Sequence, residues 1–192
     1  FEGDVDSIPE GMFAGCGSIS SFAVAEDSRH YSAVGGNLYS KDLKTLVRYA
    51  PASTASEFSV PEGTVTISEG AFEGAVSLVT VRIPATVTTI GAHAFLGCSG
   101  LEQAVIASET LSVGEGAFDL STGESVTLEI FTDAAQFPES AFGSGTTPAY
   151  DAYENFGVPH SEEIMGDALT WVVIAIVLGV IFLAVSIASV RS

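Results

Sequence analysis

An Ala-Phe pair recurs along this chain at a nearly constant interval, with a large apolar residue four positions before the Ala. One copy runs from Ile67 through Ala71 to Phe72. The later copies are spaced 23, 23 and 24 residues apart, and an earlier one has Met in place of Ala. The copies end at Phe13, Phe72, Phe95, Phe118 and Phe142. A fixed period of this length predicts a solenoid, in which each repeat forms one coil.

Each repeat also contains a pair of apolar residues two positions apart, nine and eleven residues after its Phe. Val81 and Ile83 are such a pair. After Phe118, one inserted residue moves the equivalent pair to Leu128 and Ile130. Apolar residues at a spacing of two predict a strand with one buried face. We therefore expect each coil to hold a short strand, a turn, a second extended stretch and a compact turn that carries Ala-Phe.

Stacked coils bury what a single coil cannot, so Phe72, Phe95, Phe118 and Phe142 are expected to form one aromatic column in the core. Cys16 and Cys98 both follow a repeat Phe by three residues, where other repeats have Ala75 or Ser121. We interpret this as an inward position for a small side chain, because free Cys behaves as a small hydrophobe. A disulfide is disfavoured, since a complete repeat separates the two cysteines.

Residues 25–57 interrupt the period. The segment from Tyr31 to Tyr39 predicts a hairpin around Gly35-Gly36. Residues 43–49 are expected to add a further strand before Pro51, so that the insertion continues the stack.

The chain changes character towards its C-terminus. All 24 acidic residues precede Ala168, and residues 168–190 carry no charge. At ~1.5 Å per residue this segment would span about 34 Å, enough for a transmembrane helix and longer than an ordinary core helix. Arg191 follows it, which favours an anchor in the cell membrane with the two-residue tail (191–192) in the cytoplasm and the repeats outside the cell. Residues 143–167 are interpreted as an acidic cap and stalk. Because the chain opens on Phe1, we expect an export signal to have been removed or to lie outside it.

The repeat resembles a known family. The run Ile-Pro-x-x-Val-x-x-Ile-Gly-x-x-Ala-Phe-x-Gly-Cys-x-x-Leu at residues 83–101 is similar to the BspA-like, or Treponema pallidum type, leucine-rich repeat. The resemblance covers residues 1 to about 142, weakening at 111–131 and at Phe137-Pro138. It implies a mainly β leucine-rich-repeat solenoid of about 23-residue coils with an inserted hairpin. It also implies a surface protein with an adhesive role and no catalytic residues.

A binding face is expected on the strands, at the positions between and just before the buried pairs. The candidate residues are Ser21, Glu57, Thr80, Arg82, Gln103, Val105, Thr127 and Glu129. Ala23 and Ser59 occupy the same columns. Such faces are the usual binding surfaces of solenoids, although a plain solvated face gives the same pattern.

The sequence gives little support for nucleic-acid binding or enzyme activity. With 6 Lys and Arg against 24 acidic residues, the chain lacks the basic footprint that nucleic acids require. The carboxylates are scattered, so we expect no enzyme activity, no cofactor and no metal site, although the stalk acids leave divalent cation binding open. The small residues Ala175 and Gly179 could pack against a partner helix. The sequence thus predicts a membrane-anchored binding or adhesion module for a protein or matrix ligand. The alternative is a structural subunit of an envelope layer or membrane complex.

Overall fold

The computed structural model describes residues 5–9, 11–108, 111–120, 126–132 and 137–151, which belong to one compact unit, Phe1–Phe156. The expected transmembrane helix, the tail and most of the stalk lie outside these residues. Within the described ranges, no helix is long and apolar enough to cross a membrane.

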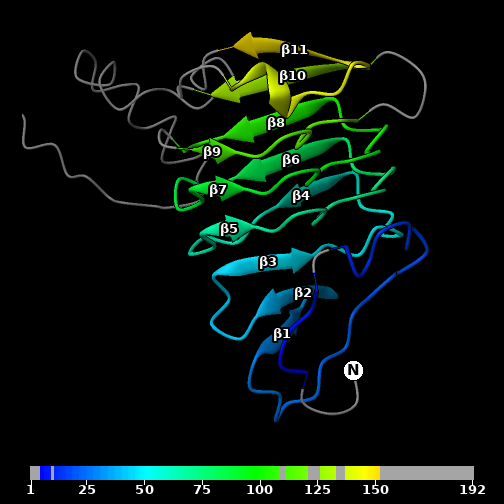
Figure 1. Ribbon diagram of the computed structural model, residues 1–192, viewed down its shortest axis with the longest axis vertical. Coiled ribbons are helices and arrows are strands. Elements are labelled where there is room, and N and C mark those ends of the chain that lie inside the picture. The colour runs from blue at the N-terminus through cyan, green and yellow to red at the C-terminus, as the bar shows by residue number, and fades with distance from the viewer. Residues whose placement is uncertain (1–4, 10, 109–110, 121–125, 133–136, 152–192) are drawn as a thin grey trace, which may run out of the picture. The chain divides into compact units, whose positions relative to one another are not determined.

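Two sheets run along the stack (Figure 1). Sheet A has the order β1 (Tyr31–Val34), β2 (Asn37–Ser40), β3 (Thr45–Arg48), β5 (Thr66–Ile67), β7 (Thr89–Ile90) and β9 (Ser112–Val113). Sheet B has the order β11 (Thr146–Asp151), β10 (Val126–Thr132), β8 (Gln103–Ile106), β6 (Thr80–Ile83) and β4 (Glu57–Ser59). A short 3-10 turn, η1, covers Glu139–Ala141. Because successive coils contribute neighbouring parallel strands, the predicted solenoid is confirmed.

The coils are stacked in the register that the repeat predicts. Thr80 pairs with Gln103 and Ile83 with Ile106, a step of 23 residues. On the other side of the coil, Ile67 pairs with Ile90 at the same step. Equivalent side chains therefore lie above one another along the stack.

The predicted aromatic column forms the centre of the core. Phe72, Phe95 and Phe118 are fully buried. The ring centroids of Phe72 and Phe95 are 4.6 Å apart, and those of Phe95 and Phe118 are 4.9 Å apart, with interplanar angles of 8° and 4°. Tyr49 continues the column, 5.1 Å from Phe72. Tyr49 comes from the inserted segment, so the insertion supplies a coil of its own.

The inserted segment has the predicted strands. β1 and β2 form an antiparallel hairpin with Gly35 and Gly36 at its tip, where both have positive φ angles of 58° and 80°. Such angles are accessible to Gly without steric cost. β3 pairs antiparallel with β2 and parallel with β5, which joins the hairpin to the repeat strands.

The alignment predicted for the strand that proves to be β10 is wrong by two residues. Ile130 pairs with Ala104 and Thr132 with Ile106, whereas Leu128 and Ile130 were expected in those places. The loop after Phe118 therefore holds three extra residues and not one. A shift of two leaves the same side chains facing the core, so the apolar pattern does not reveal it.

The prediction for the cysteines holds for only one of them. Cys98 is fully buried, and its thiol lies 3.0 Å from the Phe72 carbonyl oxygen. Burial raises the pKa of the Cys98 thiol to about 12. Cys16 is exposed, because residues 11–30 contain no strand and lie beside the stack, not in it. Both thiols are free.

Arg48 holds this N-terminal segment against the coils. Its side chain is 3% exposed and forms an ion pair with Glu73, with 3.5 Å between Nη1 and Oε2. Nη2 donates to the carbonyl oxygens of Phe13 at 3.3 Å and Glu73 at 3.0 Å, and Nη1 donates to that of Gly70. The second oxygen of Glu73 accepts from the Gly15 amide at 3.1 Å. Burial lowers the pKa of Arg48, and the Glu73 carboxylate opposes that effect.

Candidate binding face

The outward face of sheet B carries two rows of side chains, one residue from each strand. The first row crosses β4, β6, β8 and β10, and each of its residues pairs with the next. It consists of Glu57, Thr80, Gln103 and Glu129. These residues lie side by side because the strands are parallel and in register. The row therefore brings together four of the predicted site residues.

Hydrogen bonds connect three members of the first row. The Thr80 hydroxyl donates to Gln103 Oε1 over 3.4 Å, and Gln103 Nε2 donates to Glu129 Oε2 over 3.1 Å. The amide of Gln103 thus has a donor on one side and an acceptor on the other, which fixes its orientation. Glu57 and Glu129 remain exposed at the two ends of the row.

The second row crosses the same strands two residues further along. Ser59, Arg82, Val105 and Phe131 follow one another, and Asp151 of β11 pairs with Phe131. Arg82 Nη2 lies 3.3 Å from Glu57 Oε2, and their side chains are 39% and 66% exposed. This contact links the two rows on the solvent side, where an ion pair contributes about 1 kcal/mol or less.

Two of the predicted face residues are covered. Thr80 is 7% exposed and Val105 is 4% exposed, whereas both were expected to face solvent. Each occupies a central strand, with a longer side chain beside it in its row. Val105 lies between Arg82 and Phe131 in the register, and Phe131 is itself 9% exposed. Their neighbours screen these shorter side chains from water.

Two further predicted residues lie elsewhere. Ser21 is exposed, but it belongs to no strand and lies against Gly36 of the hairpin instead of extending the first row. Ala23 is also exposed and also belongs to no strand. Thr127 belongs to β10, where it pairs with Thr147 of β11, and its side chain lies outside the described residues. Glu129 takes the place beside Gln103 that was assigned to Thr127.

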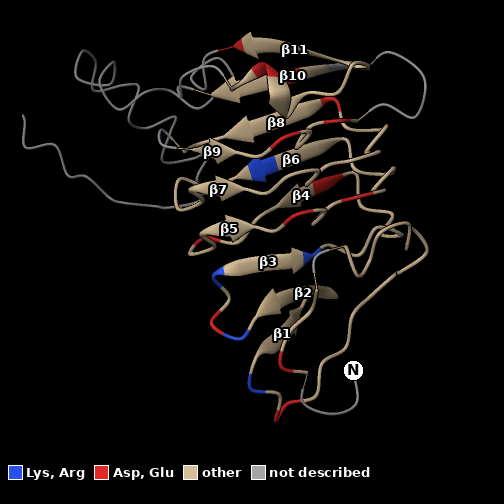
Figure 2. Ribbon diagram, in the orientation of Figure 1, with Lys and Arg blue, Asp and Glu red and all other residues tan. Residues whose placement is uncertain are grey.

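The charges of this face suit a partner with hydrogen-bond donors. The described residues that follow Arg82 in the sequence include acidic side chains and no Lys or Arg, as the colouring in Figure 2 shows. Glu129 and Asp151 are exposed on β10 and β11. Among the described residues, no group of three His, Cys, Asp or Glu side chains is placed to hold a metal ion. The described side chains of this face offer polar and ionic contacts.

Sequence reasoning missed the most constrained charged residue, Arg48. It stands in β3 next to the core residues Leu46 and Tyr49. A cation beside core positions is a signal that a buried acceptor is near, because buried charges are almost always paired. The identity of its partners depends on the position of the N-terminal segment, which carries a copy of the repeat but forms no strand over residues 11–30.

Comparison with known proteins assigns the family. A model of the BspA type leucine-rich repeat region matches residues 39–147 with six copies. The match covers more than half of the chain, and the chain belongs to this family. The matched region begins within β2 and includes only the end of that strand. A comparison with curated protein sequences found no match.

Several solved structures are similar to this chain. A leucine-rich repeat protein from Eubacterium ventriosum is 17% identical, covering 76% of this chain and 46% of its own, with a TM-score of 0.49. A leucine-rich cell surface protein from Faecalibacterium prausnitzii is 24% identical, covering 74% and 45%, with a TM-score of 0.48. The pneumococcal vaccine antigen PcpA is 17% identical, covering 69% and 37%, with a TM-score of 0.48. The chain thus matches less than half of the length of each.

Proposed function

We propose that the protein is a non-catalytic binding module of the cell surface, which recognises a protein or matrix ligand through the outward face of sheet B. The observation that carries the proposal is the first row, in which Gln103 is held between Thr80 and Glu129 by hydrogen bonds. A side chain fixed in this way recognises a partner with little loss of conformational entropy. The exposed carboxylates at the ends of the row favour a partner with basic or amide groups.

The binding experiment uses the full chain in detergent or nanodiscs, and measures retention on host cells, matrix proteins and the organism's own envelope. We expect Gln103→Ala and the pair Glu57→Gln with Glu129→Gln to weaken retention by about tenfold or more, as for residues central to an interface. Glu62→Gln is the matched control, because Glu62 is an exposed carboxylate in a turn outside both rows. Absence of retention on all three surfaces, or equal retention by all variants, would overturn the proposal.

We further propose that residues 168–190 anchor the module in the cell membrane, with the repeats outside and the two-residue tail in the cytoplasm. The support is the length of this segment and its lack of charge, followed by Arg191. Deletion of 168–190 should move the chain from the membrane fraction to the soluble fraction. Protease added outside intact cells should cleave the repeats; complete protection would contradict the orientation.

A further inference from the structure

Large apolar side chains are rarely exposed in the described part of this protein, and two of the exposed ones occupy complementary places. Four are exposed by 44% or more: Met12, Val34, Leu43 and Val76. Leu43 lies in the turn Lys41–Lys44, and Met12 lines a groove that Glu69 and Glu73 also line. An exposed apolar residue with a defined chemical setting is a candidate for a contact with a partner.

The turn that carries Leu43 is held firmly by its own side chains. The Asp42 carboxylate accepts from the Ser40 hydroxyl at 2.7 Å and from the Lys44 amide at 3.1 Å. The Ser40 hydroxyl oxygen accepts from the Thr45 amide at 2.9 Å. These bonds hold Leu43 at a φ of 60°, which is unfavourable for a branched side chain. Such strained positions cluster at sites of contact with ligands.

The groove lies where the N-terminal segment meets the coils. It has a volume of about 560 Å³. Met12 and Phe13 line it from the N-terminal segment, and Leu96 lines it from the stack. Glu69 and Glu73 add carboxylates to the lining, and Arg48 adds a cation that pairs with Glu73. Because Arg48 bonds to Phe13 and Glu73, both walls of the groove are fixed to one another.

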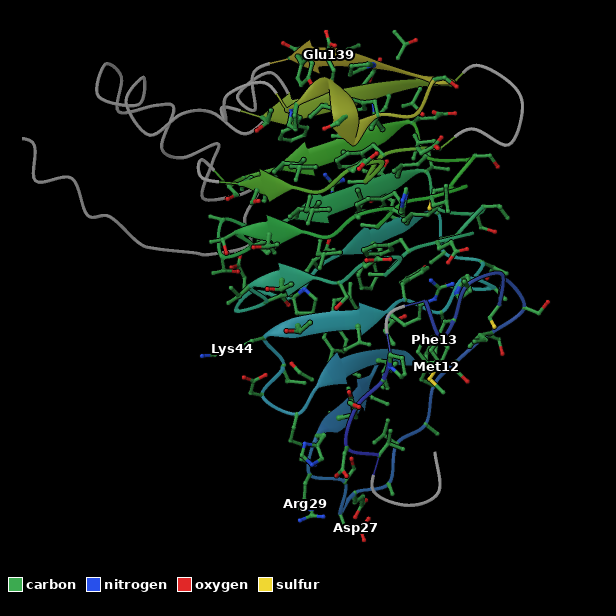
Figure 3. All side chains as sticks on the ribbon, viewed as in Figure 1. Met12, Phe13, Asp27, Arg29, Lys44 and Glu139 are labelled. Carbon is green, nitrogen blue, oxygen red and sulfur yellow. The ribbon has the colours of Figure 1, made fainter. Side chains whose placement is uncertain are left out.

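The turn and the groove complement each other in chemistry. The turn presents one apolar side chain beside two lysines and one aspartate, Lys41, Asp42 and Lys44. The groove presents apolar side chains beside the exposed Glu69 and the Arg48–Glu73 ion pair. In Figure 3, Lys44 projects from the left edge of the molecule, whereas Met12 and Phe13 lie on its right side. The turn is therefore placed to reach the groove of a different copy of the chain.

We propose that the protein associates with itself head to tail, with Leu43 of one copy inserted into the groove of the next and Lys44 facing Glu69. The occupant of the groove is thus a second copy of this chain. Each added copy presents a new free turn and a new free groove, so the contact builds an open filament of copies or closes into a ring. This inference does not depend on the binding face of sheet B, which uses other residues.

The test is sedimentation velocity of the full chain in a non-ionic detergent, from about 1 µM to about 0.5 mM, the range in which a small contact of this kind is measurable. We expect the protein mass to rise with concentration, and less so at high salt, because salt screens the lysine–glutamate contacts. Leu43→Asp and Met12→Asp should each weaken association by about tenfold or more. Val76→Asp is the matched control and should associate as the unaltered chain does.

Mixing the variants gives the decisive result. Leu43→Asp retains an intact groove and Met12→Asp an intact turn, so an equimolar mixture should form heterodimers although neither variant associates strongly alone. A chain that remains monomeric over the whole range would overturn the proposal. So would association that neither variant weakens, which would place the contact in another segment, such as residues 168–190. A mixture that fails to form heterodimers would overturn the pairing of turn with groove.

Charge exchange provides an independent measurement. Lys44→Glu and Glu69→Lys should each weaken association, and the chain with both changes should recover part of it, because the pair is then reversed and not removed. Recovery depends on the two residues meeting across copies. Circular dichroism of each variant checks that the fold is retained. The two proposals fail separately. Loss of ligand retention with self-association intact contradicts only the binding face of sheet B, and loss of self-association with retention intact contradicts only the contact of turn and groove.

Discussion

Arg48 and Glu73 form an ion pair at the junction between the N-terminal segment and the coils, with 3.5 Å between Nη1 and Oε2. The two side chains are 3% and 20% exposed. The arginine is therefore almost fully removed from water, and the glutamate partly so. A pair of this kind contributes little net stability when intact, but removal of one partner leaves an uncompensated charge and is costly.

Arg48→Met should destabilise the protein by about 3 kcal/mol, at the lower end of the range for broken buried pairs because Glu73 retains some exposure. The free energy of unfolding is measured by urea titration with far-UV circular dichroism, since the single Trp, Trp171, lies outside the described coils. Lys41→Met removes an exposed cation and should change the unfolding free energy by about 0.5 kcal/mol or less. Faster hydrogen exchange at the Gly15 amide would accompany release of the N-terminal segment; equal unfolding energies for the two variants would contradict this role.

Phe95→Ala should cost about 3–5 kcal/mol, because its fully buried ring stacks on both neighbours in the aromatic column and leaves a cavity when removed. Phe95→Leu fills most of that space and should cost clearly less. The comparison is made by urea titration of both variants. If Phe95→Ala is tolerated with a loss below about 1 kcal/mol, the column is not the core of the stack.

Gly91→Ala tests how closely neighbouring coils approach. A Cβ atom at residue 91 would lie 2.4 Å from the Glu69 amide nitrogen and 2.8 Å from the Ser68 carbonyl carbon, which are backbone atoms that cannot rotate away. We expect a loss of about 1–3 kcal/mol, typical of overpacking. Gly17→Ala is the control, because nothing lies within 4 Å of its Cβ position. Equal thermal midpoints for the two variants would exclude a tight contact at residue 91.

The two cysteines should differ in reactivity. Cys16 is exposed, and Cys98 is buried with its pKa raised to about 12. A thiol reagent at pH 8 should therefore modify one thiol in the folded protein and two in urea, with mass spectrometry locating the first at Cys16. Rapid modification of Cys98 without urea would contradict its place in the core.

The raised pKa of Cys98 also predicts a pH dependence of stability. An unfolded thiol releases its proton near its ordinary pKa of about 8.5, whereas the folded one holds its proton to about pH 12. Deprotonation thus favours the unfolded chain, so the stability associated with this group is present below about pH 8.5 and is lost as pH rises towards 12. In Cys98→Ala this part of the alkaline loss of stability should be absent.

Local repeats made most of the fold predictable. The spacing of the Ala-Phe pairs specifies the coil length, and the stacked rings of Phe72 and Phe95 follow from it. The hairpin was predictable because Gly35-Gly36 is a turn signal between strand-forming residues. The alignment of β10 was not, since a shift of two residues leaves Leu128 and Ile130 in the core and gives no trace in the apolar pattern.

The position of the candidate face was predictable from the sequence, but the exposure of its side chains was not. Strand alternation placed Gln103 and Glu129 on the outward side, where they meet. Exposure depends on neighbouring strands, and the sequence of β8 alone does not show that Val105 is covered. The groove and the Arg48 contacts depend on the N-terminal segment, whose copy of the repeat ends at Phe13. Residues 11–30 nevertheless form no strand, so the path of this segment follows from long-range contacts and not from the period.

The constant step between coils makes the length of the solenoid adjustable. Thr80 pairs with Gln103 as Ile67 pairs with Ile90, both at a distance of 23 residues. Excision of residues 84–106 would place Ile83 before Ala107, in the position that Ile106 now holds, and bring the ring of Phe118 above that of Phe72. Recombination between copies of the repeat can therefore shorten or extend the molecule by whole coils while every remaining strand keeps an equivalent neighbour. The distance between the hairpin and the last coil can be changed in evolution, or by design, in steps of a single strand spacing.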